Sequence, residues 1–117
     1  MPEIHIKRVY EPPAPSDGAR ILIDRLWPRG LSKDRAKLDA WVKEVAPSDG
    51  LRRWYGHDPR RLAEFRRRYL AELATRDEAL GELRAVAHGR VVTLLTATRE
   101  VDLSHALVLR DVLLGQG

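Results

Sequence analysis

The sequence predicts a single α/β domain over residues 1–117, in which helices flank a small, mainly parallel sheet. Residues 19–25 and 90–96 each have a continuous apolar centre with β-branched residues, the pattern of strands buried on both faces of a parallel sheet. Helical patterns fill most of the chain between them, as a right-handed crossover requires. A chain of 117 residues is long enough for one hydrophobic core and too short for two.

The first part of the chain alternates strands and loops. Residues 3–9 alternate apolar and polar side chains, so we expect a half-buried strand there. Residues 10–17 contain three prolines and are expected to form a stiff loop of polyproline character. Gly18 ends this loop, and residues 19–25 form the second strand.

The middle of the chain carries signals for helix starts. Ser32 is expected to cap a helical turn over residues 33–37. Residues 38–45 fit either a sparse helical stripe or an edge strand, and we prefer an extended segment after the short helix. Ser48 is typical of the N-cap of a helix that Gly56 closes.

Two helices are expected next. Asp58 followed by Pro59 is a strong start signal, and apolar residues on one face predict a helix over residues 59–75. A further helix is predicted over residues 77–88, where the following glycine ends it.

The last strand and helix complete the fold. The run at 90–96 is apolar through its middle, so we expect it to be central and parallel to the second strand. Asp102 is expected to cap a last helix over residues 103–114 that is apolar on most sides. Such a helix is either sandwiched inside the domain or part of a homodimer contact.

The composition limits the classes of function. There is no cysteine, which excludes disulfides, thiolate metal sites and thiol nucleophiles and suits a reducing cytoplasm. No apolar run approaches the roughly 20 residues that cross a bilayer, so we expect a cytoplasmic protein with no membrane partner. The histidines show no paired ligand spacing and no glycine fingerprint follows a strand, so no metal and no cofactor is predicted.

The chain is basic, with a formal net charge of +4, and its arginines are concentrated in residues 52–76. Arginine matches phosphate oxygens, so nucleic acid, nucleotides and phosphorylated molecules are all compatible partners. Genomic base composition also produces arginine-rich chains, and this is the preferred explanation for most of these residues. No recognised nucleic-acid-binding motif accompanies them.

A candidate site lies where the second and third buried strands end. In a parallel sheet, residues 24–30 and 96–105 emerge at the same edge, where open α/β sheets place their ligands. Asp24 and His105 are the candidate catalytic acid–base pair. The competing interpretations are an ion pair of Asp24 with a neighbouring arginine, and a buried histidine satisfied by a backbone carbonyl. In the first turn of a helix His105 lies in a field that favours its neutral ring.

Six other residues are candidate binding residues. Arginine forks can clamp an anionic small molecule, and aromatic rings can stack on a base. The candidates are Arg25, Trp27, Arg29, His57, Arg66 and Tyr69. The alternatives are nucleic-acid binding through residues 52–68, and a dimeric interaction protein without catalysis.

Several motifs together resemble one bacterial family. They are Asp24-Arg25-Leu26-Trp27-Pro28-Arg29-Gly30, Ala46-Pro47-Ser48, Leu51-Arg52-Arg53-Trp54-Tyr55-Gly56-His57-Asp58-Pro59, Phe65-Arg66-Arg67-Arg68-Tyr69 with Glu72-Leu73, and Val92-Thr93-Leu94-Leu95 leading to His105-Ala106. In this order they resemble the YeaO-like branch of the family called domain of unknown function 488. The resemblance implies a small α/β cytoplasmic protein with no established reaction. Longer relatives carry a Cys-His-Arg motif whose histidine matches His105, and here Ser104 and Ala106 replace its cysteine and arginine.

Overall fold

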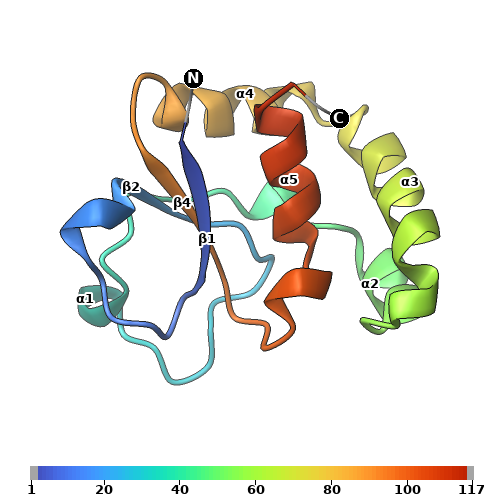
Figure 1. Cartoon of the computed structure of the whole chain (residues 1–117), viewed down its shortest axis with the longest axis horizontal. Helices are drawn as coiled ribbons and strands as arrows, with labels where there is room; N and C mark the ends of the chain where they lie inside the picture. The colour runs from blue at the N-terminus through green and yellow to red at the C-terminus, as the bar shows by residue number, and fades with distance from the viewer. Residues whose placement is uncertain (1–2, 116–117) are drawn as a thin grey trace.

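The computed structural model describes residues 3–115 and contains one four-stranded sheet in which every described pairing is parallel. The strands are β1 (Ile4–Arg8), β2 (Ala19–Leu22), β3 (Ala40–Trp41) and β4 (Val92–Thr96), in the order β1-β4-β2-β3. The α/β class and the central, parallel position of the last strand are confirmed (Figure 1).

The register of β2 and β4 fixes where their ends emerge. Ile21 pairs with Leu94 and Leu22 with Leu95, so the two strands stop almost level with each other. The chain that follows each strand therefore leaves the sheet at the same edge. This edge is the lower one in Figure 1.

In the described part of the chain, residues 3–115, five α-helices accompany the sheet: α1 (Lys33–Ala36), α2 (Asp49–Tyr55), α3 (Leu62–Leu73), α4 (Asp77–Ala87) and α5 (His105–Leu113). The predicted Ser32 and Ser48 caps are confirmed, because each side chain accepts a hydrogen bond from the backbone N–H three residues later. The extended interpretation of residues 38–45 is correct in its first half, where β3 pairs with β2, and residues 43–45 then form a 3-10 turn.

Two predicted helix starts differ from the structure. The helix expected from Pro59 begins with a 3-10 turn, Pro59–Arg61, which Asp58 caps, before α3 starts at Leu62. The expected cap of the last helix by Asp102 is wrong. Residues 101–103 form their own 3-10 turn and Ser104 is extended, so α5 starts at His105.

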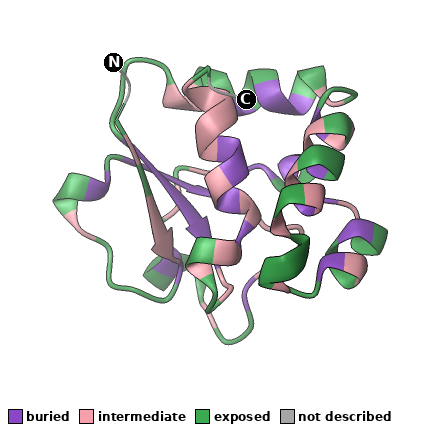
Figure 2. Cartoon of the chain, turned by 45° about the vertical axis from the view of Figure 1, so that its right-hand side comes forward, coloured by how far each residue is buried: buried purple, intermediate pink, exposed green. Residues whose placement is uncertain are grey.

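The two faces of the sheet are covered differently. The larger hydrophobic cluster joins Ile21, Ile23 and Leu94 to residues of α2, α3, α4 and α5. The smaller cluster lies on the other face, where Leu22 and Leu95 pack against partly buried apolar side chains, including Trp27. Figure 2 shows β4 buried along its length between these layers.

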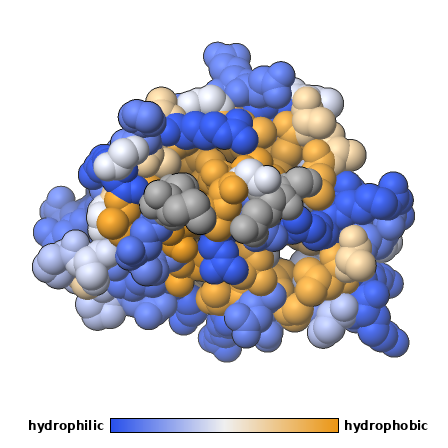
Figure 3. Space-filling view, turned by 45° about the horizontal axis from the view of Figure 1, so that its top comes forward, coloured by the Kyte–Doolittle hydropathy of each residue, from blue (hydrophilic) through white to orange (hydrophobic). Residues whose placement is uncertain are grey.

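The face of the molecule on the α4 side has an apolar centre. In the view that brings this side forward, apolar side chains gather in the middle and hydrophilic ones surround them (Figure 3). Within residues 3–115, no helix combines the length and the apolar character that crossing a membrane would need.

A buried ion pair ties the start of β2 to its surroundings. Asp17 and Arg20 are each 4% exposed, and Arg20 Nη1 lies 2.5 Å from Asp17 Oδ2. Lys7 also reaches the Asp17 carboxylate, at 3.0 Å, while Arg20 donates to the backbone carbonyl of Ala36 at the end of α1. The cluster therefore holds β1, β2 and α1 together.

Candidate functional site

A cavity of about 500 Å³ opens at the C-terminal ends of β2 and β4. We call it the strand-end cavity. Its walls are the segment after β2, the segment after β4, the inner side of α2, and the first residue of α5. Its polar lining residues include Asp24, Arg25, Arg29, Arg52, His57 and His105.

Asp24 is the first residue of the cavity wall after β2, and its carboxylate is held by the neighbouring strand end. Oδ1 accepts a hydrogen bond from Thr96 Oγ1 at 2.8 Å, and Oδ2 accepts one from the Ala97 N–H at 2.8 Å. The described contacts of the carboxylate thus join the two strand ends. The predicted alternative, an ion pair with Arg25 or Arg29, is not formed among residues 3–115.

His105 lies beside Asp24, as the predicted topology requires. Its Nε2 is 2.9 Å from the Ile23 carbonyl oxygen and 3.7 Å from Asp24 Oδ1. A carbonyl can only accept a hydrogen bond, so Nε2 carries the proton. The neutral ring therefore keeps Nδ1 as an acceptor. The edge-to-face contact with the Tyr69 ring, 5.9 Å between centroids, orients the imidazole further.

The surroundings of His105 keep its ring neutral. Burial lowers the pKa of His105, because the charged form is poorly solvated there. Asp24 and the Ile23 carbonyl raise this pKa, whereas the positive charge of Arg52 and the nearby His57 lower it, and the net shift is downward. At neutral pH the ring, which lines the cavity, is thus uncharged.

This balance predicts opposite effects of two substitutions on one measured pKa. Asp24→Asn removes an attractive charge and should lower the pKa of His105 further, whereas Arg52→Gln removes a repulsive one and should raise it. Ring-proton NMR shifts of His105 followed against pH measure both. Shifts in the same direction in the two variants would contradict the described arrangement.

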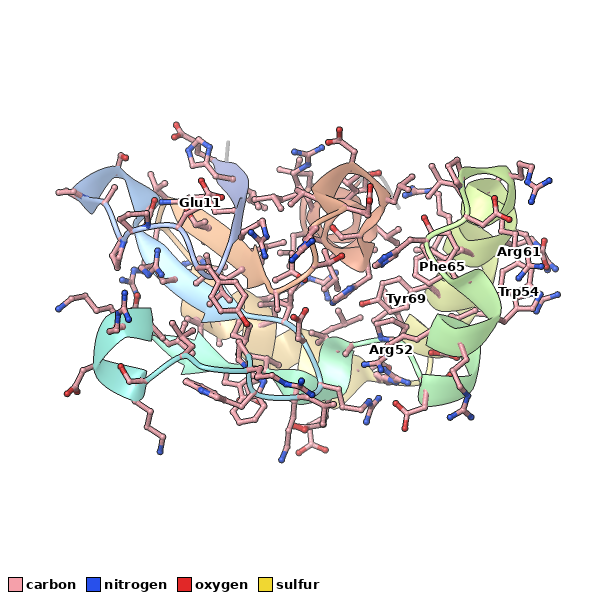
Figure 4. The ribbon with its side chains drawn as sticks, turned by 90° about the horizontal axis from the view of Figure 1, so that it is seen from below. Glu11, Arg52, Trp54, Arg61, Phe65 and Tyr69 are labelled. Carbon is pink, nitrogen blue, oxygen red and sulfur yellow. The ribbon has the colours of Figure 1, made fainter. Side chains whose placement is uncertain are left out.

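Arg52 is the cationic residue that the sequence interpretation did not select. It lies on α2 one residue after Leu51 and three before Tyr55, both of which are buried, so it emerges at the edge of the inward face. Figure 4 places Arg52 on the side of α2 that faces the sheet, and Trp54 on the opposite side. The i, i+3 spacing from Tyr55 was the available sequence signal.

Arg25 and Arg29 also line the strand-end cavity. Arg25 donates from Nη2 to the Ala46 carbonyl at 3.3 Å, and its Nε is buried without a partner among the described residues. The buried Nε is closed to solvent, so Arg25 can contact a ligand only through its terminal nitrogens. Arg29 is exposed, and its carbonyl accepts a hydrogen bond from the Tyr10 hydroxyl at 2.9 Å.

Aromatic residues line other parts of the strand-end cavity. Trp27 donates from Nε1 to the Leu31 carbonyl at 2.6 Å and packs edge-on against Trp41. His57 packs edge-on against Tyr55, and its φ of 54° places its backbone in the left-handed region. That region is unfavourable for most residues other than glycine.

Two predicted binding residues do not line the strand-end cavity. Arg66 forms an ion pair with Asp111 of α5, 2.9 Å from Nη1 to Oδ2. The Tyr69 hydroxyl donates to the buried Val45 carbonyl, and burial raises the pKa of Tyr69 well above its usual range. The structure therefore places both residues in the packing of α3, where Tyr69 supports the His105 ring.

Ser104 occupies the position at which longer relatives carry a cysteine. It is 1% exposed, and its hydroxyl donates to the Val101 carbonyl at 2.7 Å. Ser104 does not line the strand-end cavity. Among residues 3–115, no three His, Asp or Glu side chains lie close enough together to hold a metal ion.

The fold and the strand-end cavity define a small α/β protein with an arginine-lined site at the carboxyl ends of its central parallel strands. The chain belongs to the YeaO-like DUF488 family, and the family model described as "Inactive DUF488-N3 subclade" matches residues 3–116. The predicted family resemblance is therefore confirmed.

Two bacterial relatives match nearly the whole chain. The uncharacterized protein Rv3073c of Mycobacterium tuberculosis is 49% identical over 113 residues, which are 97% of this chain and 95% of the relative. The uncharacterized protein YeaO of Escherichia coli is 46% identical over 108 residues, 92% of this chain and 94% of the relative. No solved structure matches the chain.

Proposed function

We propose that the strand-end cavity binds a small anionic, nucleotide-like molecule, and that the protein acts as a binding or sensory protein. The observation that carries this proposal is the excess of positive charge in the cavity wall. Arg25, Arg29 and Arg52 line it, and Asp24 is the one carboxylate among the lining residues that the structure describes. Several guanidinium groups that line one cavity without an equal number of carboxylates favour the binding of an anionic ligand.

The shape and the aromatic lining support a ligand with a ring. A cavity of about 500 Å³ lies within the range of small-molecule sites. Trp27 and Tyr10 contribute to its lining. Aromatic faces of this kind stack on planar rings such as nucleobases.

Three observations favour binding over catalysis. Both carboxylate oxygens of Asp24 already accept hydrogen bonds, and the Ser104 hydroxyl points to a backbone carbonyl. The family description contains the word "Inactive". Acid–base chemistry by Asp24 and His105 is the competing proposal, supported by the neutral Nδ1 of His105, and turnover of a bound ligand would establish it.

The nucleic-acid alternative receives less support from the arginines of residues 52–68. Arg60 pairs with Asp58, and Arg67 and Arg68 both pair with Glu64, whose pKa is lowered to about 2, chiefly by those hydrogen bonds. Arginines that are paired in this way are less available to phosphates. A homodimer through α5 remains a proposal that size-exclusion chromatography with light scattering can test.

The experiment compares two adjacent arginines. Nucleotides, phosphorylated metabolites and dicarboxylates are screened by thermal shift, since a ligand at a hundredfold excess over its Kd stabilises the fold by about 2.7 kcal/mol. Arg52→Gln should weaken binding of the best ligand by roughly tenfold or more, because it removes one charge-assisted contact. Calorimetry measures the affinity.

Arg53→Gln is the matched control. Arg53 is exposed on the same helix and does not line the strand-end cavity, yet the substitution changes the net charge equally. Equal losses in the two variants would indicate a diffuse electrostatic effect and would count against the cavity. Stabilisation by no anion in the screen would refute the proposal itself.

A further inference from the structure

The charges around the strand-end cavity can be balanced group by group. Three guanidinium groups, those of Arg25, Arg29 and Arg52, face one carboxylate, Asp24, so two positive charges remain when the histidines are neutral. Arg29 and Arg52 are exposed, so solvent offsets part of this excess, and the remaining positive potential attracts an anion. A ligand that carries two negative charges would neutralise the two unmatched positive charges of the wall. A carboxylate or a phosphodiester, with one negative charge, would leave one positive charge of the wall unmatched.

The donors gather at one end of the cavity. Arg52 belongs to α2 and His57 follows the Gly56 cap of that helix, so both line the α2 side of the cavity. Arg25 reaches the same side, because its Nη2 donates to the carbonyl of Ala46, two residues before the N-cap of α2. Two guanidinium groups offer more N–H donors than the two oxygens of a carboxylate can accept.

The other end differs in chemistry. Tyr10 is joined to Arg29 by a hydrogen bond, and Trp27 lies two residues before Arg29 in the same wall. Tyr10 and Trp27 provide aromatic surface in this part of the wall, and Trp27 packs against the smaller hydrophobic cluster, away from α2. The cavity thus has a donor-rich end and an aromatic end.

We infer that the ligand is a phosphomonoester, with its dianionic phosphate at the end formed by Arg25, Arg52 and His57 and its organic part toward Trp27. This inference rests on the proposed function and narrows its ligand class. The terminal oxygens of a phosphomonoester can accept hydrogen bonds from the N–H donors of these side chains. Its charge at neutral pH, between −1.5 and −2, matches the excess of two positive charges in the cavity wall.

The test uses three probes that differ mainly in charge. Adenosine 5′-monophosphate carries a monoester, cyclic 3′,5′-adenosine monophosphate carries a diester with a single charge, and adenosine carries neither. Calorimetry with the full chain at pH 7.5 should show the monoester binding at least roughly tenfold tighter than the diester, and adenosine binding weakest.

A second measurement at lower pH separates phosphate charge from protein charge. The monoester gains a proton near pH 6, whereas the diester does not. His57, His105 and the other charged groups of the wall act on both probes, so the ratio of the two affinities isolates the phosphate. Between pH 7.5 and 5 we expect this ratio to fall by roughly tenfold, and an unchanged ratio would overturn the inference.

The remaining outcomes distinguish this inference from the function on which it rests. Equal affinities for the monoester and the diester at pH 7.5 would refute the inference that the site prefers a dianionic phosphate. The proposal that the cavity binds an anion would still stand. Binding of adenosine as tight as that of the monoester would refute both. Failure of all three probes, together with stabilisation by a dicarboxylate in the screen, would refute the phosphomonoester and retain the anion site.

Discussion

Asp17→Asn is expected to lower the free energy of unfolding by about 3–5 kcal/mol, because it leaves a buried arginine without its countercharge. The side chains of Asp17 and Arg20 are each 5% exposed, and Lys7 shares the same carboxylate. Asparagine has nearly the same shape but no charge, so the loss comes from electrostatics and hydrogen bonding. Urea denaturation measures the change.

Asp102→Asn is the control for this prediction. Asp102 is exposed in the 3-10 turn before α5, so the same chemical change there should alter stability by about 0.5 kcal/mol or less. If Asp17→Asn were as mild as Asp102→Asn, the buried cluster would contribute nothing to the free energy of unfolding.

The same carboxylate also makes stability depend on pH. Burial acts to raise the pKa of Asp17, but hydrogen bonds from the Ala14 N–H, Lys7 and Arg20 outweigh it, and the net pKa lies below its ordinary value of 3.8. The unfolded chain therefore takes up the proton first as pH falls. The stabilisation is complete above about pH 4 and is lost below it, and the Asn variant should lack this component.

The sequence was sufficient to predict the fold class because its strongest signals are strands buried on both faces. The apolar centres of residues 19–25 and 90–96 are typical of inner strands, although β2 itself ends at Leu22, and inner parallel strands require crossover connections. The start of the last helix was less predictable. Asp102 is a good N-cap residue, yet residues 101–103 form a separate turn and α5 starts at His105. We attribute this start to tertiary packing, because local propensity alone favours a helix that begins after Asp102.

The candidate site was predictable to the extent that strand ends determine it. Asp24 and His105 follow adjacent parallel strands, so their approach to 3.7 Å was expected from topology. Their catalytic role stays a prediction. Arg66 was selected because apolar residues flank it, but its partner, Asp111, lies 45 residues away on a helix whose docking the sequence does not specify.

A stack of aromatic rings connects the cavity to the core. Phe65 lies against Tyr55 with 4.0 Å between ring centroids and against Tyr69 at 5.6 Å, and Tyr69 meets His105. The stack joins α2, α3 and α5. Figure 4 shows Phe65 and Tyr69 on the side of α3 that faces the sheet, with Arg61 on the other side. The positions of Arg52 and His105 therefore depend on Phe65.

Phe65→Ala is expected to lower the free energy of unfolding by about 3–5 kcal/mol, as is usual for truncating a buried phenylalanine. Phe65 is 1% exposed and lines the floor of the strand-end cavity. Removing the ring leaves Tyr55 without its stacking partner, so α2 can shift and carry Arg52 with it. Urea denaturation measures the stability, and the NMR shifts of the His105 ring report the loss of order in the site.

Phe65→Leu separates the filling of volume from ring stacking. Leucine keeps most of the buried volume but forms no aromatic pair, and such pairs contribute about 0.5–1.5 kcal/mol each beyond the area they bury. We therefore expect a smaller loss, about 1–2 kcal/mol, with the His105 shifts displaced in the same direction as in the alanine variant. If the Phe65→Leu variant left the His105 shifts unchanged, the Phe65 ring would contribute only its buried volume. The order of the site would then not depend on ring stacking.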